Sequence, residues 1–420
     1  MTPPATATRP AASAPTASNA AETAAQAASI RRDWMLLAAA TIAFGIGFGI
    51  NSGAAQNYAV QALGLSRVDL SRLESMREIP GLLTAAMIGL AGLVTALTAP
   101  RLASLALAFV AVGIACIGQA GSFWPLVACN ICWSIGLHTW LTVQPSLTLS
   151  LSRAGHHGHG LGLMMRYQSV AIMLGLAFVL LSARVRLGYP LTFLAAGVVI
   201  AAGCFLVARI PAFRGGEVRQ HLVFRPAYWR YYGLMLLDGG RRQVVQTFAL
   251  LILIKEFGVG LGTVAMLQLF NNALTMFAAP VVGRWTDRLG ERRVLSCYYS
   301  LVVVVFFGYT QIGGLANAWG WRPEWLFYGL FAVDNLLFTA SVGIQTYIRH
   351  TAPPEELSPS LAMGLTWNHV AAVTVPLIAG QIWAHFGYAV IFRCGILLAL
   401  ASVAMCLTLP RRPAHGVSGS

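Results

Sequence analysis

Residues 283–293 read GRWTDRLGERR, a charged stretch between two apolar ones. Its flanks, 261–284 and 292–313, are each long enough to cross a bilayer, since a spanning helix needs about 20 mostly apolar residues. Gly283 would let two helices approach closely, and Asp287 can approach the positive N-terminus of a neighbouring helix. The stretch therefore predicts a charged turn between two membrane helices.

The whole chain has the composition of a polytopic membrane protein. Of its 420 residues 57% are hydrophobic and 10% charged, and its mean hydropathy is +0.68. Soluble domains contain about 25% charged residues. The formal net charge of +14 lies mostly in short loops between apolar segments, so it indicates orientation in a membrane and not a nucleic-acid partner.

Twelve apolar segments are expected to form membrane-spanning helices in an all-α integral membrane fold. They are 34–62, 77–99, 102–121, 123–150, 158–183, 187–210, 229–255, 261–284, 292–313, 322–347, 358–384 and 388–409. The longest loop separates the sixth segment from the seventh. The expected domains are a disordered cytosolic tail (1–30), an N-terminal six-helix bundle (31–210), a central cytosolic loop (211–227), a C-terminal six-helix bundle (228–410) and a second cytosolic tail (411–420).

Basic residues set the expected orientation. With both termini in the cytosol, the cytosolic loops and tails hold 17 of the 28 Lys and Arg residues, the opposite loops hold six, and five lie inside spans. Positive charge is enriched in cytosolic loops, so both termini are predicted to be cytosolic. The expected location is the inner, cytoplasmic membrane of a bacterium.

Weak internal matches support two related halves. Aligning the fifth span with the eleventh places Arg166 opposite Asn368, and aligning the fourth with the tenth pairs Gln144 with Gln345. Transporters are often built from duplicated bundles. Polar residues at equal depths in two halves therefore favour a duplicated membrane protein.

The turn at 283–293 resembles the signature loop of the major facilitator superfamily. The positions that match its pattern are Gly283, Asp287, Arg288, Gly290, Arg292 and Arg293. With the twelve spans and the central loop, the resemblance covers residues 31–410, without assigning a subfamily. It implies two pseudo-symmetric six-helix bundles and secondary active transport by alternating access, with these residues latching the halves on the cytosolic side.

Two departures from the family's patterns bear on function. The equivalent stretch of the first half keeps Gly92 but has Ala96 where the acid belongs, so the latch is expected to be one-sided. Drug/proton antiporters of the superfamily usually carry an arginine in the fourth helix and a Gly-Pro-Gly-Gly pattern in the fifth, and neither is present here.

The seventh span carries charges that an apolar helix would not tolerate unpaired. Arg241 and Arg242 lie near its middle beside Asp238, and a charge there costs about 3 kcal/mol on insertion scales. The arginine fork suits carboxylate or phosphate, so we expect these arginines and Gln246 to bind substrate. The alternative is an internal ion pair between Asp238 and Arg242, spaced i,i+4. Gly239 and Gly240 are expected to permit a local helix break.

Other intramembrane polar residues are candidates for the same site. Arg166, Asn368 and Gln345 are expected to add to substrate binding. Asp334, followed by His369 and Glu78, is the candidate for proton coupling, since an acid at the bilayer centre tends towards a raised pKa. The alternative for Asp334 is an ion pair with an arginine of the seventh span.

The sequence therefore predicts a transporter for a small organic anion or zwitterion, without enzyme activity, cofactor or metal. Its expected partners are that substrate, protons and membrane lipids, and it is expected to be monomeric. The alternatives are a drug or metabolite efflux antiporter, a sensor that has lost transport, and a polytopic membrane enzyme. His156, His157 and His159 could bind a metal, although a glycine-rich turn at the membrane edge is the simpler interpretation.

Overall fold

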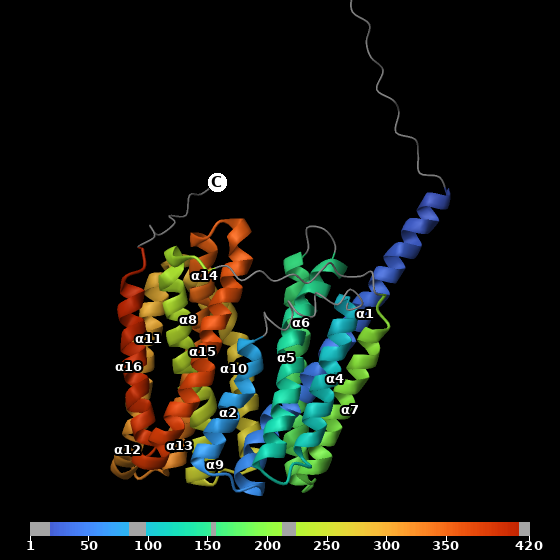
Figure 1. Cartoon of the computed structure of the whole chain (residues 1–420). Coiled ribbons are helices and arrows are strands. Elements are labelled where there is room, and N and C mark those ends of the chain that lie inside the picture. The colour runs from blue at the N-terminus through green and yellow to red at the C-terminus, as the bar shows by residue number, and fades with distance from the viewer. Residues whose placement is uncertain (1–16, 84–97, 153–156, 212–223, 411–420) are drawn as a thin grey trace, which may run out of the picture.

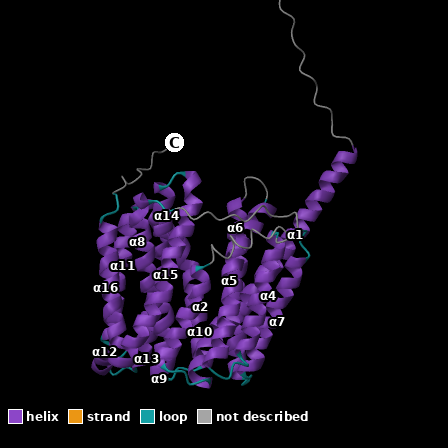
Figure 2. Cartoon of the chain, in the orientation of Figure 1, coloured by secondary structure: helices purple, strands orange, loops and turns teal. Residues whose placement is uncertain are grey.

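A computed structural model describes residues 17–83, 98–152, 157–211 and 224–410. The described residues form helices joined by short turns, and none of them lies in a strand (Figure 2). Two bundles stand side by side, and the start of the first helix lies at the same end of the molecule as the end of the last (Figure 1). We name this end the terminal side and the opposite end the distal side.

The N-terminal half packs around its first helix, which contacts α6 and α7, while α4 packs on α5 and α7. Its elements are α1 (Ala17–Asn57), the π-helical η1 (Tyr58–Ala62), α2 (Arg67–Leu82), α4 (Ala99–Ile117), α5 (Phe123–Leu151), α6 (His157–Arg184) and α7 (Tyr189–Ala208).

In the C-terminal half, α8 packs against α15 and α16, and α11 packs against α16. Its elements are η2 (Pro226–Tyr228), α8 (Trp229–Gln243), η3 (Val244–Ala249), α9 (Leu250–Phe257), α10 (Leu261–Leu289), α11 (Glu291–Thr310), α12 (Ile312–Trp319), α13 (Pro323–Phe338), η4 (Thr339–Ser341), α14 (Val342–Thr351), α15 (Pro354–Phe386) and α16 (Tyr388–Leu407). The halves meet where α2 packs on α15 and α6 on α10.

Helix α1 lies unusually close to α6 because glycine lines the contact. A Cβ added at Gly49 would lie 2.3 Å from the Ile172 carbonyl oxygen, and one at Gly175 would lie 2.2 Å from that of Ile46. Small residues at such positions let membrane helices gain packing energy at short range. The N-terminal half is therefore built on a glycine-mediated helix pair.

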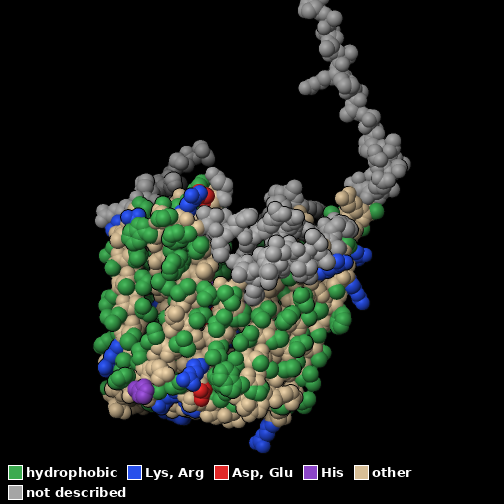
Figure 3. Space-filling model, in the orientation of Figure 1, with side chains coloured by type: hydrophobic (Ala, Val, Ile, Leu, Met, Phe, Trp, Pro, Cys, Tyr) green, Lys and Arg blue, Asp and Glu red, His purple; other side chains and the backbone are tan. Residues whose placement is uncertain are grey.

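The outer surface confirms a membrane protein. Within the described residues, ten helices are long and apolar enough to cross a membrane. Large apolar side chains such as Phe277, Val304 and Leu397 point outward, and charged side chains gather towards the two ends of the visible face (Figure 3). The seventh predicted span is not among the ten, because charges interrupt its apolar run. The second predicted span extends into residues 84–97, outside the described part of the chain.

Two boundaries differ from the sequence-based expectation. Helix α1 begins at Ala17, inside the segment expected to be disordered, because alanine is the strongest helix former and extends the helix. The turn expected over 283–293 shrinks to Gly290, whose φ of 79° lets α10 end and α11 begin at once. Residues 1–16 and 411–420 lie outside the described residues.

The seventh span is interrupted later than expected. Helix α8 runs through Gly239 and Gly240, and the irregularity is the π-helical η3 that follows it. Gly239 instead serves close packing, since a Cβ there would lie 2.7 Å from the carbonyl oxygen of Asn368 on α15. The pair of glycines thus brings α8 onto α15 and leaves the helix continuous, and π-bulges of the kind that follows are frequent at functional sites.

Candidate functional site

Helix α8 holds a buried ion pair. The Nη1 atom of Arg241 donates to Asp334 Oδ1 at 3.1 Å and to Oδ2 at 2.9 Å, and the side chains are 1% and 2% exposed. The guanidinium carbon also lies 5.4 Å from the centre of the Tyr298 ring and 5.2 Å from that of Phe338. This is the alternative that the sequence left open for Asp334, so Arg241 has a structural partner within its own half.

Asp238 does not pair with Arg242, the partner that their i,i+4 spacing suggests. The hydroxyls of Tyr298 and Tyr299 on α11 donate to its Oδ1 at 3.2 and 3.0 Å. The i,i+4 ion pair with Arg242 is not among the interactions of the described residues. The buried cluster thus combines two carboxylates, Asp238 and Asp334, with the single cation Arg241, so it carries an excess negative charge when both acids are ionised.

Arg242 has the opposite environment from its neighbour. Its side chain is exposed, and its Nε donates to Gln246 Oε1 at 2.6 Å across one turn of the helix. Its guanidinium carbon lies 5.4 Å from the centre of the Phe338 ring. Two adjacent arginines are therefore divided: one is neutralised inside the bundle and the other remains accessible near the middle of the seventh span.

A second cluster lies where the halves meet. Glu78 on α2, His138 on α5 and His369 on α15 each offer a ligand atom, and these atoms lie within 4.8 Å of one another. The two imidazole rings meet edge to face with centroids 4.8 Å apart. The expected part of Glu78 and His369 in proton coupling stays a prediction.

Arg77 and Glu74 complete this second cluster. Arg77 Nη2 lies 2.6 Å from Glu74 Oε2 and 2.8 Å from Glu78 Oε1. Ser134 on α5 donates to the Arg77 carbonyl oxygen at 2.5 Å. Sequence analysis missed Glu74, although the spacing Glu74, Arg77, Glu78 places all three within one turn of a helix.

On the distal side, polar contacts join the halves. Arg67 Nη2 lies 2.8 Å from Glu256 Oε1, which also accepts from Trp383 Nε1 at 3.0 Å. Lys255 donates to the Leu65 carbonyl oxygen at 2.8 Å. We name these residues the distal clasp, and none of them was singled out from the sequence.

The interface between α1 and α10 holds polar side chains with unused hydrogen-bonding capacity. Gln268 donates to the Ser52 carbonyl oxygen at 2.9 Å, which joins the two helices. Beside them, Asn51 Oδ1 and both amide atoms of Asn271 are buried without a hydrogen-bond partner among the described residues. Buried polar groups normally have partners, so such atoms mark positions where a polar ligand or water would bind.

The remaining predicted substrate residues are dispersed. Arg166 on α6 and Gln345 on α14 are exposed, and the described contacts do not join them to Arg242. Asn368 is buried and donates through Nδ2 to the Met235 carbonyl oxygen at 3.2 Å. This hydrogen bond joins α15 to α8, and the role of Asn368 in substrate binding stays a prediction.

The family motif lies at the terminal side and is open in this conformation. Asp287 and Arg288 are exposed, and a Cβ added at Gly283 would meet nothing within 4 Å, so this glycine mediates no close approach here. Arg292 donates to the Leu409 carbonyl oxygen at 2.9 Å. Its neighbour Arg293 is exposed. The matching positions Gly92 and Ala96, and His156 of the histidine turn, lie outside the described residues.

A polar contact also ties the start of α15 to the segment before α8. Tyr228 donates to Glu356 Oε2 at 2.8 Å, and Arg225 Nη2 lies 2.7 Å from Glu356 Oε1. The hydrogen bond from Tyr228, together with the charge of Arg225, lowers the pKa of Glu356 below its ordinary value. This carboxylate therefore stays ionised and fixes the entry into the C-terminal half.

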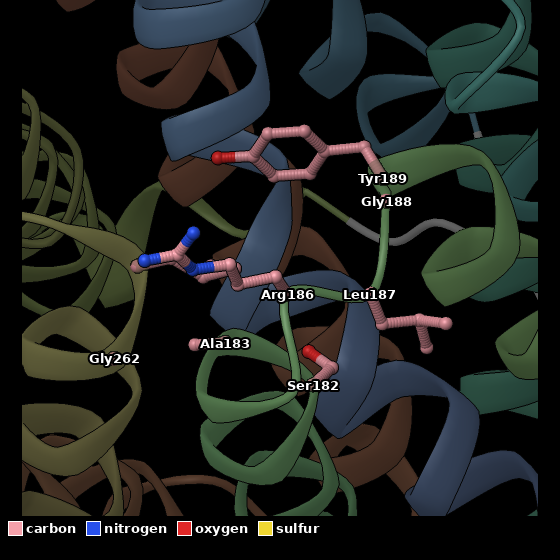
Figure 4. Close-up of a pocket in the computed structure, with 8 residues that line it drawn as sticks. Ser182, Ala183, Arg186, Leu187, Gly188, Tyr189 and Gly262 are labelled. Atoms are coloured by element: carbon pink, nitrogen blue, oxygen red, sulfur yellow. The ribbon is translucent and has the colours of Figure 1, made fainter.

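A pocket lies on the distal side between α6 and α10. It is lined by Ser182, Arg186 and Tyr189 from the N-terminal half and by Gly262 from the other (Figure 4). Arg186 adopts a left-handed φ of 54°, which is unusual for a residue with a side chain. Its lining residues include none of the candidate substrate residues, and we assign no function to it.

Comparisons with known proteins agree with this architecture. The sequence profile of the Major Facilitator Superfamily matches residues 231–420. The crystal structure of the nucleoside transporter NupG gives a TM-score of 0.72 at 11% identity, covering 90% of this chain and 100% of that one. A D-xylose–proton symporter gives 0.68 at 15% identity, covering 91% and 98%. A comparison with curated proteins found no significant match.

A bacterial homologue of the human lysosomal transporter Spinster, in an inward-facing and occupied conformation, gives a TM-score of 0.66 at 13% identity, covering 89% of this chain and 95% of that one. At these identities the likeness shows the fold. Fold and helix composition together show a multi-pass membrane protein with a transporter fold. The chain therefore has the fold of these transporters, and residues 231–420 match the Major Facilitator Superfamily in sequence.

Proposed function

We propose that this transporter carries a small organic anion, or a zwitterion with an acid group, and that Arg242 binds the acid group. The observation that carries the proposal is the exposed guanidinium of Arg242 near the middle of the seventh span. Arg241 is neutralised by Asp334, so Arg242 is the accessible one of the two central arginines of α8. A guanidinium presents a planar fork of donors that matches a carboxylate or phosphate.

The surrounding groups suit a polar solute. Gln246 orients the Arg242 Nε, which leaves the Nη atoms for a ligand. The unpartnered Asn51 and Asn271 could bind hydroxyl or amino groups of the same molecule. Arg166 and Gln345 are proposed to contribute when the halves move. These groups favour a small hydrophilic substrate over a large apolar one.

A binding test separates Arg242 from its neighbour. Purified protein is heated with a panel of carboxylates, phosphates and amino acids, and ligands that raise the unfolding midpoint are then used for uptake into proteoliposomes. Arg242→Gln should abolish the rise and the uptake, while Arg242→Lys should keep part of both because the charge remains. Normal uptake by Arg242→Gln would disprove the proposed role of Arg242.

We propose further that Asp334 couples transport to protons. It is buried beside Arg241 and near the second carboxylate of the cluster, Asp238, with Tyr298 and Tyr309 on the facing helix. Protonation of Asp334 would break the ion pair with Arg241, which is the carboxylate contact of Arg241 among the described residues, and so let α8 and α13 move apart. Asp334→Asn should keep substrate exchange across the membrane and lose uphill accumulation driven by a pH gradient. Unchanged accumulation would remove Asp334 from the mechanism.

The proposed orientation places the terminal side in the cytosol of a bacterium. The distal clasp would then close the outer side, so this conformation would be the inward-facing one. The exposed Asp287 supports this assignment, since a latch on the cytosolic side would be released in that state. Adding a membrane-impermeant protease to intact spheroplasts tests the orientation, because tags on both termini should be protected.

A further inference from the structure

A carboxylate and two imidazoles meet between the halves of the transporter. Glu78 and His138 come from the N-terminal half and His369 from the C-terminal half, and their ligand atoms lie within 4.8 Å of one another. No metal was expected from the sequence, in which these three residues are widely separated. Two histidines with one glutamate are a known ligand set for zinc.

The free atoms of the cluster face one another. Glu78 Oε1 is bound by Arg77, whereas Oε2 lies 3.3 Å from His369 Nδ1. That nitrogen is buried, and its geometry towards Oε2 does not make a hydrogen bond, so it has no hydrogen-bond partner among the described residues. An imidazole nitrogen and a carboxylate oxygen 3.3 Å apart, without a well-formed hydrogen bond between them, could share a cation.

The local charges are nearly balanced. Arg77 supplies one positive charge, and Glu74 and Glu78 supply two negative charges within 2.8 Å of it. Arg242 on α8 also interacts electrostatically with Glu78 and offsets the remaining negative charge. The case for a bound cation therefore rests on the geometry of the ligand atoms.

Gly81 makes the space for both rings. A Cβ at this position would lie 2.5 Å from His369 Cε1 and 2.7 Å from His138 Cε1. The absence of a side chain at Gly81 therefore lets the α2 backbone come close to both imidazole rings. Any larger residue would push the two rings apart.

From this geometry we propose that Glu78, His138 and His369 bind one divalent transition-metal ion of the zinc class. Because the ligands come from α2, α5 and α15, a bound ion holds the two halves together at mid-depth, in the conformation with the distal clasp closed. The ion would act as a regulator that arrests the transport cycle. The ligands of this site are different side chains from Arg242, which is proposed to bind the substrate.

The experiment uses the full-length protein in detergent, with His156, His157 and His159 changed to Gln so that this turn cannot bind the ion. Co²⁺ is the probe, since its visible d–d absorption reports a coordination site of low symmetry. The parent should bind one Co²⁺ per chain, and Zn²⁺ should displace it and raise the thermal unfolding midpoint. His369→Gln and Glu78→Gln should each lower Co²⁺ affinity by more than about tenfold.

The control is His385→Gln, which removes an exposed histidine from the same helix and should leave binding unchanged. His138→Gln removes a ligand from another helix, so the test survives if one variant fails to fold. Metal-free unfolding midpoints identify such a failure. The proposal is overturned if the parent binds no Co²⁺, or if folded variants lacking these ligands keep the parent's absorption and affinity.

Discussion

Arg241 and Arg242 have different environments because neighbouring residues of a helix point about 100° apart around its axis. Arg241 points into the bundle, where Asp334 pairs with it, and Arg242 points to an accessible surface. Sequence alone could place both arginines at the membrane centre. It could not choose between them, since the choice depends on which helices surround α8.

The difference predicts separate effects on stability. Arg241→Gln leaves Asp334 buried without its partner, and breaking a buried pair this way costs about 3–5 kcal/mol. Arg242→Gln removes an exposed charge and should change stability by less than about 1 kcal/mol. Thermal unfolding of purified protein measures both, and Arg241→Gln/Asp334→Asn should recover part of the loss. Equal midpoints for the two single variants would contradict the assignment.

Side-chain partners were the least predictable feature at this scale. Asp238 was weighed as a partner for Arg242, yet the hydroxyls of Tyr298 and Tyr299 satisfy it from another helix. His138 enters the interfacial cluster only through contacts between helices, whereas Glu74 enters it through Arg77 on its own helix. Long-range contacts of this kind leave no local pattern in a single sequence, whereas the spacing of Glu74, Arg77 and Glu78 on one helix does.

At the scale of the helices, the apolar segments were predictable because bilayer thickness fixes their length. The interruption of the seventh span was expected at Gly239 and Gly240 but occurs in η3. Glycine weakens a helix locally, yet here tertiary packing between α8 and α15 retains it. The position of a π segment depends on such packing and not on composition.

The two glycines give a matched pair of variants. A Cβ at Gly239 would lie 2.7 Å from a backbone oxygen of α15, whereas a Cβ at Gly240 would meet only flexible side chains, the nearest at 3.3 Å. Gly239→Ala should therefore force α8 and α15 apart and lower the unfolding midpoint and transport. Gly240→Ala should leave both close to the parent. If the two variants behave alike, close packing at Gly239 is not the reason for this glycine.

The start of α15 should respond to pH through Glu356. Its pKa is lowered in the folded protein by the Tyr228 hydrogen bond, followed by the Arg225 contacts. A lowered carboxyl pKa stabilises the fold above the unfolded-state pKa, and that stability is lost as pH falls through the folded-state value. Tyr228→Phe should therefore lower the unfolding midpoint near neutral pH, and the difference from the parent should shrink in acid. A difference that is constant with pH would contradict this account.

At the scale of the whole molecule, the halves are joined at the distal side and at mid-depth, and the family motif at the terminal side is exposed. The apolar spans and the resemblance to a transporter family could be predicted from the sequence, since they rest on apolar length, loop charge and one motif. The conformation does not, because the same residues must support at least two states of similar free energy. The distal clasp was missed for this reason: Arg67, Glu256 and Trp383 read as ordinary ends of helices.

Two substitutions at opposite ends should therefore act in opposite directions. Glu256→Gln removes the charge that binds Arg67, and one charge-assisted contact contributes about 1–3 kcal/mol, enough to change a population ratio about tenfold. The distal side should then open more often, and labelling of a cysteine placed at Gln61 should increase.

Asp287→Asn should weaken the proposed latch of the other state, so that labelling at Gln61 falls and labelling at the exposed Trp285 position rises. The control is Asp69→Asn, which removes an exposed acid near the clasp whose contacts stay within the N-terminal half. If Glu256→Gln and Asp287→Asn shift labelling in the same direction, the clasp and the motif do not gate opposite sides.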